Sequence, residues 1–312
     1  MNPWFLGAYA GYASFADKNK ENDAQYLSGL QDLAHIAGLE LPFYGDLSES
    51  NSDKLLRTLP KHWDYIVTLL PGTMQALSKQ SDIGLASQTA DGRKAAMNRM
   101  TLVHRRVHEI NQRCGRSAVR AIELHSAPTK PFGNTQALYS SLEELQTWDW
   151  QGADLILEHC DTWRSDGASI KGFLSLREEL GVLKDLDIRL GLNWGRSVIE
   201  ERDPEGAMKH IAAAGEQLGS FFFSGTALDD PQYGSWADSH APLQLDSGGV
   251  WNPSQGLLTP ARVSQTCRAL ADRPGVLLGI KVQPSPASLT IAQRLDFLAQ
   301  QINAFEAARA AV

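Results

Sequence analysis

Residues 118–124 read AVRAIEL, residues 153–159 read ADLILEH and residues 275–282 read GVLLGIKV. Each stretch is an almost continuous apolar run with little alternation between apolar and polar positions. Such runs are typical of parallel strands that are covered on both faces, because a strand with one solvated face alternates instead. We therefore expect these stretches to be strands of a parallel sheet.

Around these strands, short apolar stretches alternate with longer segments of helical period along the chain. We expect eight strands, at residues 5–9, 39–43, 65–70, 119–125, 155–161, 188–194, 221–224 and 276–283. Helices are expected near residues 23–37, 51–60, 92–113, 135–148, 172–185, 204–218, 259–271 and 288–309. Eight such units predict an α/β fold, a (β/α)8 TIM barrel that forms a single domain over residues 1–312. An open doubly wound sheet is the alternative, although GAYAGYAS lacks the G-x-G-x-x-G phosphate-binding pattern of such sheets.

The composition favours a protein that acts on small molecules. With a net charge of −7 and dispersed acidic residues, the chain lacks the basic stripe that nucleic acid or an anionic membrane would attract. No apolar run approaches the roughly 20 residues of a membrane span, and the first residues do not resemble a signal peptide. Cys114, Cys160 and Cys267 are widely spaced, which predicts a reducing compartment. We expect a cytoplasmic protein, mature from residue 1, whose partner is a sugar or sugar acid, and we leave a homo-oligomer open.

Two connections are longer than simple loops, at residues 71–91 and 225–258. Both follow a predicted strand. Insertions at such places lie on the carboxyl face of a barrel, where the active sites of TIM barrels lie. The second connection is therefore a candidate lid.

Charged residues near the ends of two neighbouring strands are candidates for catalysis. Glu123 and His125 lie two positions apart on the fourth strand, and Glu158 and His159 end the fifth. A buried charged group must be paired or used, because an unpaired one costs several kcal/mol. We expect Glu123, Glu158 and His125 to converge, and His159 to point away from Glu158. A purely structural salt bridge is the alternative.

The end of the sixth strand offers groups suited to binding. Asn193, Trp194 and Arg196 supply an amide, an aromatic face and a guanidinium within four residues. We predict that they contact the substrate. The alternative is that Trp194 belongs to the core and Arg196 pairs with Glu200 or Glu201.

The long connection after the seventh strand contains Trp236, Asp238 and His240. An acid and an imidazole two residues apart could bind a metal or relay a proton. Trp236 could stack on the apolar face of a sugar ring. We predict a catalytic role for His240 and substrate contacts for Trp236 and Asp238.

Lys281 lies within the predicted eighth strand, where lysine is rare without a partner or a task. Three roles remain open: an ion pair with Glu123 or Glu158, an anchor for an anion shared with Arg196, or an amine that forms a Schiff base. We place Lys281 among the candidate catalytic residues.

The alternation of strands and helices, Glu40 on the second strand and Glu158 on the fifth resemble the xylose-isomerase-like barrels, which include sugar isomerases, epimerases and barrel endonucleases. The blocks at 193–196, 223–225 and 236–240 look like an uncharacterised bacterial branch of that superfamily. The resemblance implies the TIM-barrel fold, and no activity comes with that branch.

The resemblance also implies a divalent metal held by carboxylates and a histidine from the fifth to eighth strands. Glu158 matches this pattern, but Asn193 stands where an aspartate is expected and Lys281 where the last glutamate is expected. An ammonium group repels a metal cation. We therefore expect that no cofactor is required and that a divalent metal is bound poorly, although Glu158, Asp238 and His240 could form a different site.

These candidates predict an enzyme of carbohydrate metabolism that isomerises, epimerises or eliminates by acid–base chemistry. Glu158 and Glu123 would act as base and acid, with His125 or His240 as the proton shuttle. One alternative is a glycoside hydrolase that uses Glu123 and Glu158 as its carboxylate pair. Another is a sugar-binding barrel without catalysis.

Overall fold

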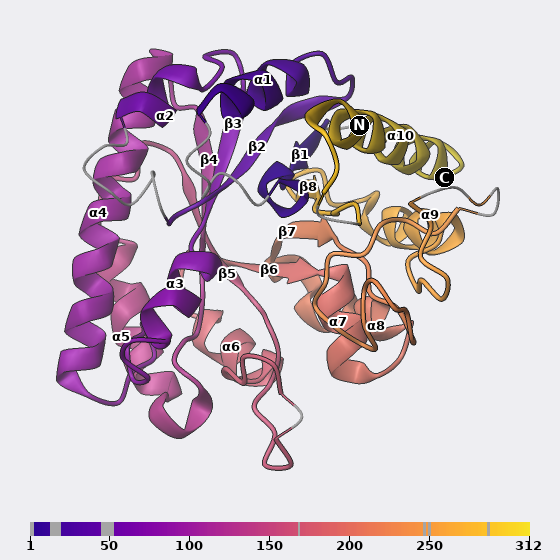
Figure 1. Ribbon diagram of the computed structural model, residues 1–312. Coiled ribbons are helices and arrows are strands. Elements are labelled where there is room, and N and C mark those ends of the chain that lie inside the picture. The colour runs from indigo at the N-terminus through magenta and orange to yellow at the C-terminus, as the bar shows by residue number, and fades with distance from the viewer. Residues whose placement is uncertain are drawn as a thin grey trace. The chain divides into compact units, whose positions relative to one another are not determined.

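The eight strands of the computed structural model are parallel and hydrogen-bonded in chain order, and the sheet closes from β8 back to β1 (Figure 1). Helices follow the strands along the chain, so the fold is the expected α/β (β/α)8 TIM barrel. The structure describes residues 3–12, 20–44, 53–167, 169–245, 248, 251–285 and 288–312, with only the backbone at 20–22 and 53–55. The strands are β1 (Trp4–Leu6), β2 (Ile36–Pro42), β3 (Asp64–Thr68), β4 (Val119–Leu124), β5 (Asp154–Glu158), β6 (Arg189–Asn193), β7 (Leu218–Phe223) and β8 (Leu277–Ile280).

Eight helices lie where the periodicity predicts them, but their ends differ, and the first predicted helix, 23–37, ends at Leu30, before β2 begins at Ile36. They are α1 (Lys20–Leu30), α2 (Asp53–Thr58), α4 (Ala90–Cys114), α5 (Thr135–Leu145), α6 (Leu176–Leu183), α8 (Gly206–Ala214), α9 (Pro260–Leu270) and α10 (Ile291–Ala310). Residues 51 and 52 of the second predicted helix lie outside the described residues.

Two further helices, α3 (Leu70–Leu77) and α7 (Trp194–Glu201), begin directly after strands and were not expected. The long connection expected at residues 71–91 thus contains most of α3. Pro71 lies in the first turn of α3. Backbone N–H groups there have no acceptor within the helix, so the absence of an N–H in proline costs no hydrogen bond. Asn193 caps α7, since its side-chain oxygen accepts a hydrogen bond from the Arg196 N–H.

The strands are shorter at their carboxyl ends than predicted. The predicted third strand included Leu70, and the predicted sixth strand included Trp194, but both residues start a helix. The predicted eighth strand included Lys281, which follows β8 directly and donates its backbone N–H to the Phe223 carbonyl at 2.8 Å. Lys281 is thus placed just beyond its strand, whereas Glu123, Glu158 and Asn193 lie within theirs.

The chain forms two compact units, and the single-domain organisation stays a prediction. Unit 1 comprises residues 1–40, 193–213 and 221–312, and unit 2 comprises residues 41–192 and 214–220. In unit 1, the Trp4 ring packs edge-on against the rings of Phe223 and Phe305. In unit 2, the apolar side chains of β3, β4 and β5 are buried on both faces of the sheet, as the continuous apolar runs predict.

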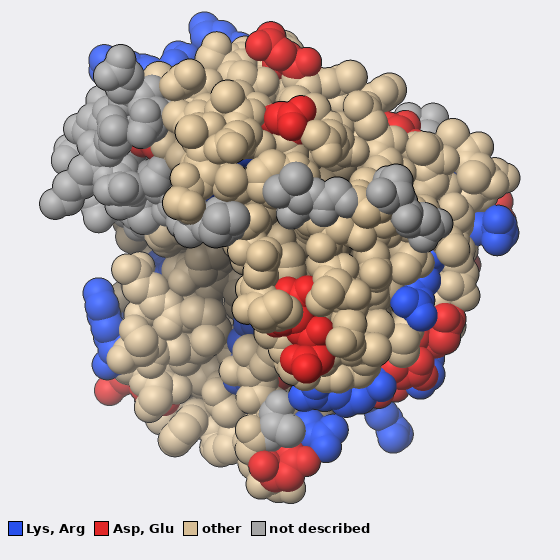
Figure 2. Space-filling model, turned by 45° about the vertical axis from the view of Figure 1, so that its right-hand side comes forward, with Lys and Arg blue, Asp and Glu red and all other residues tan. Residues whose placement is uncertain are grey.

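The described residues include no helix that is both long and apolar enough to cross a membrane. On the face shown in Figure 2, acidic and basic side chains are interspersed. They form no extended basic patch on that face. This distribution agrees with the dispersed charge of the sequence.

Candidate functional site

A buried acid–imidazole pair lies at the carboxyl ends of two adjacent strands of unit 2. The Nε2 atom of His125 is 2.7 Å from Oε2 of Glu158, and the two side chains are 1% and 2% exposed. Leu124 pairs with Leu157 in the register of β4 and β5, so the next residue of each strand lies beside the other. The expected convergence of His125 and Glu158 is therefore observed.

Glu123 is placed differently from this pair. It lies opposite Ile156, two positions closer to the start of its strand than His125. Its Oε1 atom accepts a hydrogen bond from the Ser220 hydroxyl at 3.1 Å, and the side chain is fully buried. Glu123 thus lies deeper along β4 than the His125–Glu158 pair.

A second buried carboxylate anchors the segments that follow β4 and β5. Glu179 of α6 lies 2.6 Å from Nδ1 of His159 through Oε2, and its Oε1 accepts a hydrogen bond from Ser126. The carboxylate therefore fixes the residue after His125 and the residue after Glu158. His159 points away from Glu158, as expected from alternation along an extended chain. Neither Ser126 nor Glu179 carries a signal in the sequence that indicates this contact.

Unit 2 contains one group of residues that could hold a metal ion among those described. It consists of His125, Glu158 and Cys160, whose ligand atoms all lie within 4.8 Å of one another and are buried. The Cys160 side chain packs in an apolar cluster with Ala127 and Phe173. Apolar surroundings favour the neutral thiol, whereas a metal ligand must be a thiolate. These three residue types can all bind a metal ion, but the apolar packing of Cys160 is unfavourable for a cation.

In unit 1, Lys281 and Glu40 form a buried ion pair. The Nζ atom of Lys281 is 2.6 Å from Oε1 of Glu40, and the side chains are 1% and 0% exposed. The ammonium also lies 5.2 Å from the centre of the Tyr9 ring and 5.6 Å from that of the Phe222 ring. Tyr9 donates its hydroxyl to the same carboxylate oxygen at 3.4 Å. An ion pair was one of the expected roles of Lys281, but Glu40 was not the expected partner.

The register of β1 explains why Glu40 and Lys281 meet. Leu6 pairs with Leu39 on one side and with Ile280 on the other, so Gly7 follows between the two charged residues. A Cβ atom at Gly7 would lie 2.6 Å from Oε2 of Glu40 and 2.9 Å from Cγ of Lys281. Only glycine leaves the space in which the pair forms.

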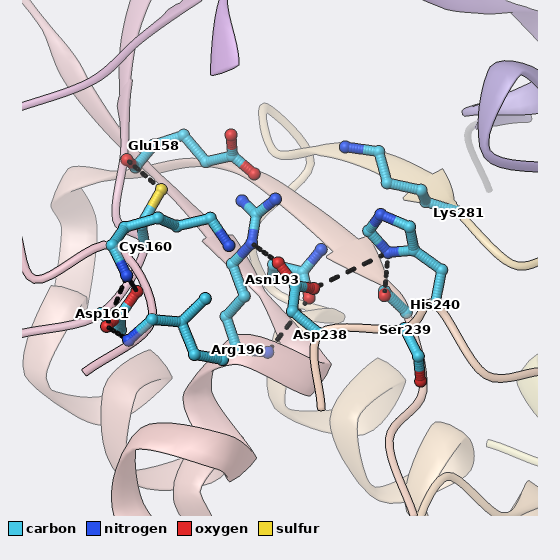
Figure 3. Close-up of polar contacts among 12 residues, drawn as sticks. Glu158, Cys160, Asp161, Asn193, Arg196, Asp238, Ser239, His240 and Lys281 are labelled. Atoms are coloured by element: carbon cyan, nitrogen blue, oxygen red, sulfur yellow. Dashed lines mark hydrogen bonds and ion pairs between the residues drawn. The ribbon is translucent and has the colours of Figure 1, made fainter. Parts of the chain in front are cut away.

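A chain of polar contacts links the end of β6 to the long connection after β7 (Figure 3). The Nε atom of Arg196 is 3.3 Å from Oδ2 of Asp238, and Oδ1 of Asp238 is 3.9 Å from Nδ1 of His240. The same His240 nitrogen is 2.7 Å from the Ser224 hydroxyl. Arg196, Asp238 and His240 are thus brought together, with Asp238 as the carboxylate partner of Arg196.

Asn193 contributes to this part of unit 1 through its amide. It is 1% exposed and its Oδ1 atom caps α7. Its Nδ2 atom has no hydrogen-bond partner among the described residues. A buried donor without a partner costs free energy, which a ligand oxygen would recover. The metal that the resemblance implies does not fit here. The side-chain oxygen of Asn193 already accepts the hydrogen bond that caps α7, and Lys281 is a cation.

Of the two tryptophans proposed to contact a sugar, Trp194 is buried and Trp236 is half-buried with a guanidinium over its ring. Trp194 is 1% exposed, so a ligand would reach its ring only after a rearrangement. The guanidinium of Arg202 lies 5.3 Å from the centre of the Trp236 ring. Their positions favour packing over stacking on a ligand.

The connection from 225 to 258 is held at several points among its described residues. Gly225 pairs with Ala241 as an antiparallel bridge. The Asp230 carboxylate accepts hydrogen bonds from the backbone of Gln232 and Tyr233 and from the backbone and hydroxyl of Ser254. Residues 236 and 240 have φ angles of 50° and 52°, in the left-handed region that costs free energy for non-glycine residues. These contacts hold Asp238 and His240 in place.

The comparisons with known proteins agree with this fold. The "Uncharacterized protein STM3670" of Salmonella typhimurium (strain LT2) is 36% identical over 306 residues, covering 96% of each chain. A solved xylose isomerase domain containing protein from Salmonella typhimurium LT2 has a TM-score of 0.61 at 10% identity and covers 98% of both chains. D-psicose 3-epimerase has a TM-score of 0.54 at 15% identity, covering 99% of this chain and 97% of that chain.

At such low identities, the two solved structures establish the fold alone. The family assignment rests on the sequence. A family model described as "Domain of unknown function (DUF4862)" matches residues 5–297. The expected likeness to xylose-isomerase-like barrels is confirmed for the fold, and the chain belongs to the DUF4862 family.

Proposed function

We propose that the protein is a sugar-converting enzyme that moves a proton at a carbon next to a carbonyl or hydroxyl group, as an isomerase, an epimerase or a lyase does. The observation that carries this proposal is the buried contact between His125 and Glu158 at the carboxyl ends of β4 and β5. Active sites of TIM barrels lie at the carboxyl ends of the strands. The proposal does not choose among the three reactions.

The chemistry of the pair suits proton transfer. A carboxylate that contacts an imidazole at hydrogen-bond distance can hand a proton to it and take one back. In this proposal Glu158 removes the proton from the substrate and His125 accepts or returns it. Burial excludes water, which strengthens the electrostatic interactions of both groups with a reacting oxygen.

Unit 1 carries a separate set of candidate binding groups, and the proposal assigns them roles within that unit. The Lys281 ammonium would stabilise an oxyanion, and the Asn193 amide would donate to an oxygen atom of a bound sugar. His240 remains a candidate proton shuttle there, since Ser224 and Asp238 hold its ring. Arg196 and Asp238 would bind hydroxyl groups as a neutral pair. Because each cation faces a carboxylate, neither requires an anionic substrate.

The names of the structural neighbours favour a sugar as the substrate. One is an epimerase whose structure was determined in the presence of D-fructose, and another carries a xylose isomerase domain. An acid–base role is less well supported for Glu123 than for Glu158. Glu123 lies nearer the start of β4, and its carboxylate accepts a hydrogen bond from the Ser220 hydroxyl. We therefore place Glu158 and His125 at the centre of the mechanism.

The test is solvent exchange. A panel of aldoses, ketoses and sugar acids is incubated with the protein in D2O, and NMR follows the loss of each C–H signal beside the carbonyl. Wild-type protein should exchange at least one member, and Glu158→Gln should lower that rate by about 100-fold or more. Glu144→Gln, on the exposed face of α5, is the matched control and should exchange at the wild-type rate.

Thermal unfolding of both variants separates chemistry from stability. An unchanged exchange rate in Glu158→Gln would remove Glu158 from the mechanism. Absence of exchange and of product across the panel with wild-type protein would favour a sugar-binding barrel without catalysis.

A further inference from the structure

A small cavity in unit 2 opens beside the His125–Glu158 pair. It has a volume of about 40 Å³ and is lined by residues that follow β2, β3 and β4 and by one side of α4. Its walls are mostly apolar, with Phe43, Leu69 and Met100 among them. His125 forms part of the lining, so a molecule in the cavity would lie next to the proposed acid–base pair.

Among the described residues of this lining, Arg99 of α4 is the one whose side chain always carries a charge. Its guanidinium donates to the Gly72 carbonyl at 2.6 Å. Among the described residues, no carboxylate lies within ion-pair distance of it, and it is half-buried. Burial lowers the pKa of Arg99, which indicates that its surroundings penalise the charged form. Arginine nevertheless remains protonated in proteins, so its charge has no carboxylate counterion among the residues that the structure describes.

Arg99 therefore differs from the two cations that the sequence suggested for anion binding. Arg196 faces Asp238 and Lys281 faces Glu40, so protein carboxylates already balance both. A guanidinium beside an apolar cavity gains most from an anion that enters the cavity, because hydrogen bonds to a charged partner are the strong ones. Its planar fork matches the two oxygens of a carboxylate.

The size of the cavity limits the group that it can hold. A volume of about 40 Å³ corresponds to roughly three water molecules, which leaves room for a carboxylate and one attached carbon but not for a sugar ring. The ring or chain of the ligand would have to extend out of the cavity. The apolar walls suit the carbon to which the carboxylate is attached.

We propose that this cavity is a carboxylate-binding subsite, in which Arg99 holds the acid group of a short hydroxy acid or sugar acid beside His125. The inference deepens the proposed function, and it rests on that function only for the statement that the bound molecule is a substrate. The acid group is bound in unit 2, at Arg99, and Arg99 determines the preference for acids over neutral sugars.

The test uses lactate and lactamide, which have nearly the same shape and differ in charge. Their binding is measured by NMR line broadening and by calorimetry at low salt. Lactate should bind wild-type protein at least about tenfold more tightly than lactamide, and Arg99→Gln should abolish the difference. Arg99→Lys should retain part of it. Arg105→Gln, an exposed arginine of the same helix, is the matched control and should leave it unchanged.

A second variant fills the cavity without touching the charge. Ala96 lines the cavity from α4, and Ala96→Leu should weaken lactate binding about tenfold while Arg99 stays in place. Equal binding of lactate and lactamide, no binding of either up to about 100 mM, or an unchanged preference in Arg99→Gln would overturn the proposal. Glu158→Gln should still bind lactate. Loss of exchange activity with intact binding would thus separate the proposed function from this subsite.

Discussion

The Nζ atom of Lys281 lies 2.6 Å from Oε1 of Glu40, and the two side chains meet beside Gly7, which has no side chain of its own. The strands that carry the two residues both pair with β1. The pair is almost wholly excluded from solvent, so each charge depends on the other for compensation.

Removing one partner should therefore destabilise the protein strongly. Glu40→Gln should lower the free energy of unfolding by about 3–5 kcal/mol, because it removes the negative charge that faces the buried Lys281 ammonium. Urea denaturation measures the change. Glu40→Gln with Lys281→Met should recover much of the loss, since neither residue then carries a charge. A single variant that stays within about 0.5 kcal/mol of wild type would contradict the assignment of a tightly coupled pair.

The carboxylate that anchors the connection after β7 should make stability depend on pH. Burial by itself would raise the pKa of Asp230, but hydrogen bonds from Ser254, Gln232 and Tyr233 outweigh it and hold the pKa below its ordinary value. A lowered pKa in the folded state adds stability above the unfolded value of about 4, and this contribution is lost as the pH falls through the folded value. Asp230→Asn should therefore cost about 1–3 kcal/mol at pH 7 and progressively less towards pH 3.

Urea denaturation of wild type and Asp230→Asn across this range checks the prediction. Asp229→Asn is the matched control, because Asp229 is adjacent to Asp230 but exposed, and it should cost little at any pH. A loss in Asp230→Asn that does not change between pH 7 and pH 3 would mean that the ionised carboxylate is not the anchor.

Metal content should be low. Protein purified without chelator should carry well below one divalent ion per chain, because Cys160, one of the three candidate ligands in unit 2, packs in an apolar cluster. Elemental analysis before and after dialysis against a chelator measures the content. About one tightly held ion per chain, lost in Glu158→Gln, would instead support a metal site at His125, Glu158 and Cys160.

Much of the fold could be predicted because its signals are local. A strand that is covered on both faces must be apolar at nearly every position, and residues 118–124 and 153–159 are. The two missed helices, α3 and α7, start directly after strands, where no loop separates the two periodicities. Their start signals are Pro71 and Asn193, which also occur in turns.

The candidate site could be predicted where neighbouring strands determine it. His125 and Glu158 end adjacent strands, so the order of strands in a barrel is enough to bring them together. Asp238 and His240 were recognised as a pair from their spacing, and the structure adds Arg196 and Ser224 as their contacts. Glu179 could not be predicted as the partner of His159, because it lies on a helix. The sequence around Glu179 does not show which residue that face of the helix contacts.

The sequence by itself determined the parallel barrel and the strand ends that carry polar groups, because both follow from apolar periodicity within a few residues. Only the tertiary structure decided which charges compensate each other. Lys281 meets Glu40 because both flank β1, and Arg99 faces a cavity because α4 packs with one side towards it. These contacts join segments far apart in the chain, and their distances depend on register and packing that no local pattern contains.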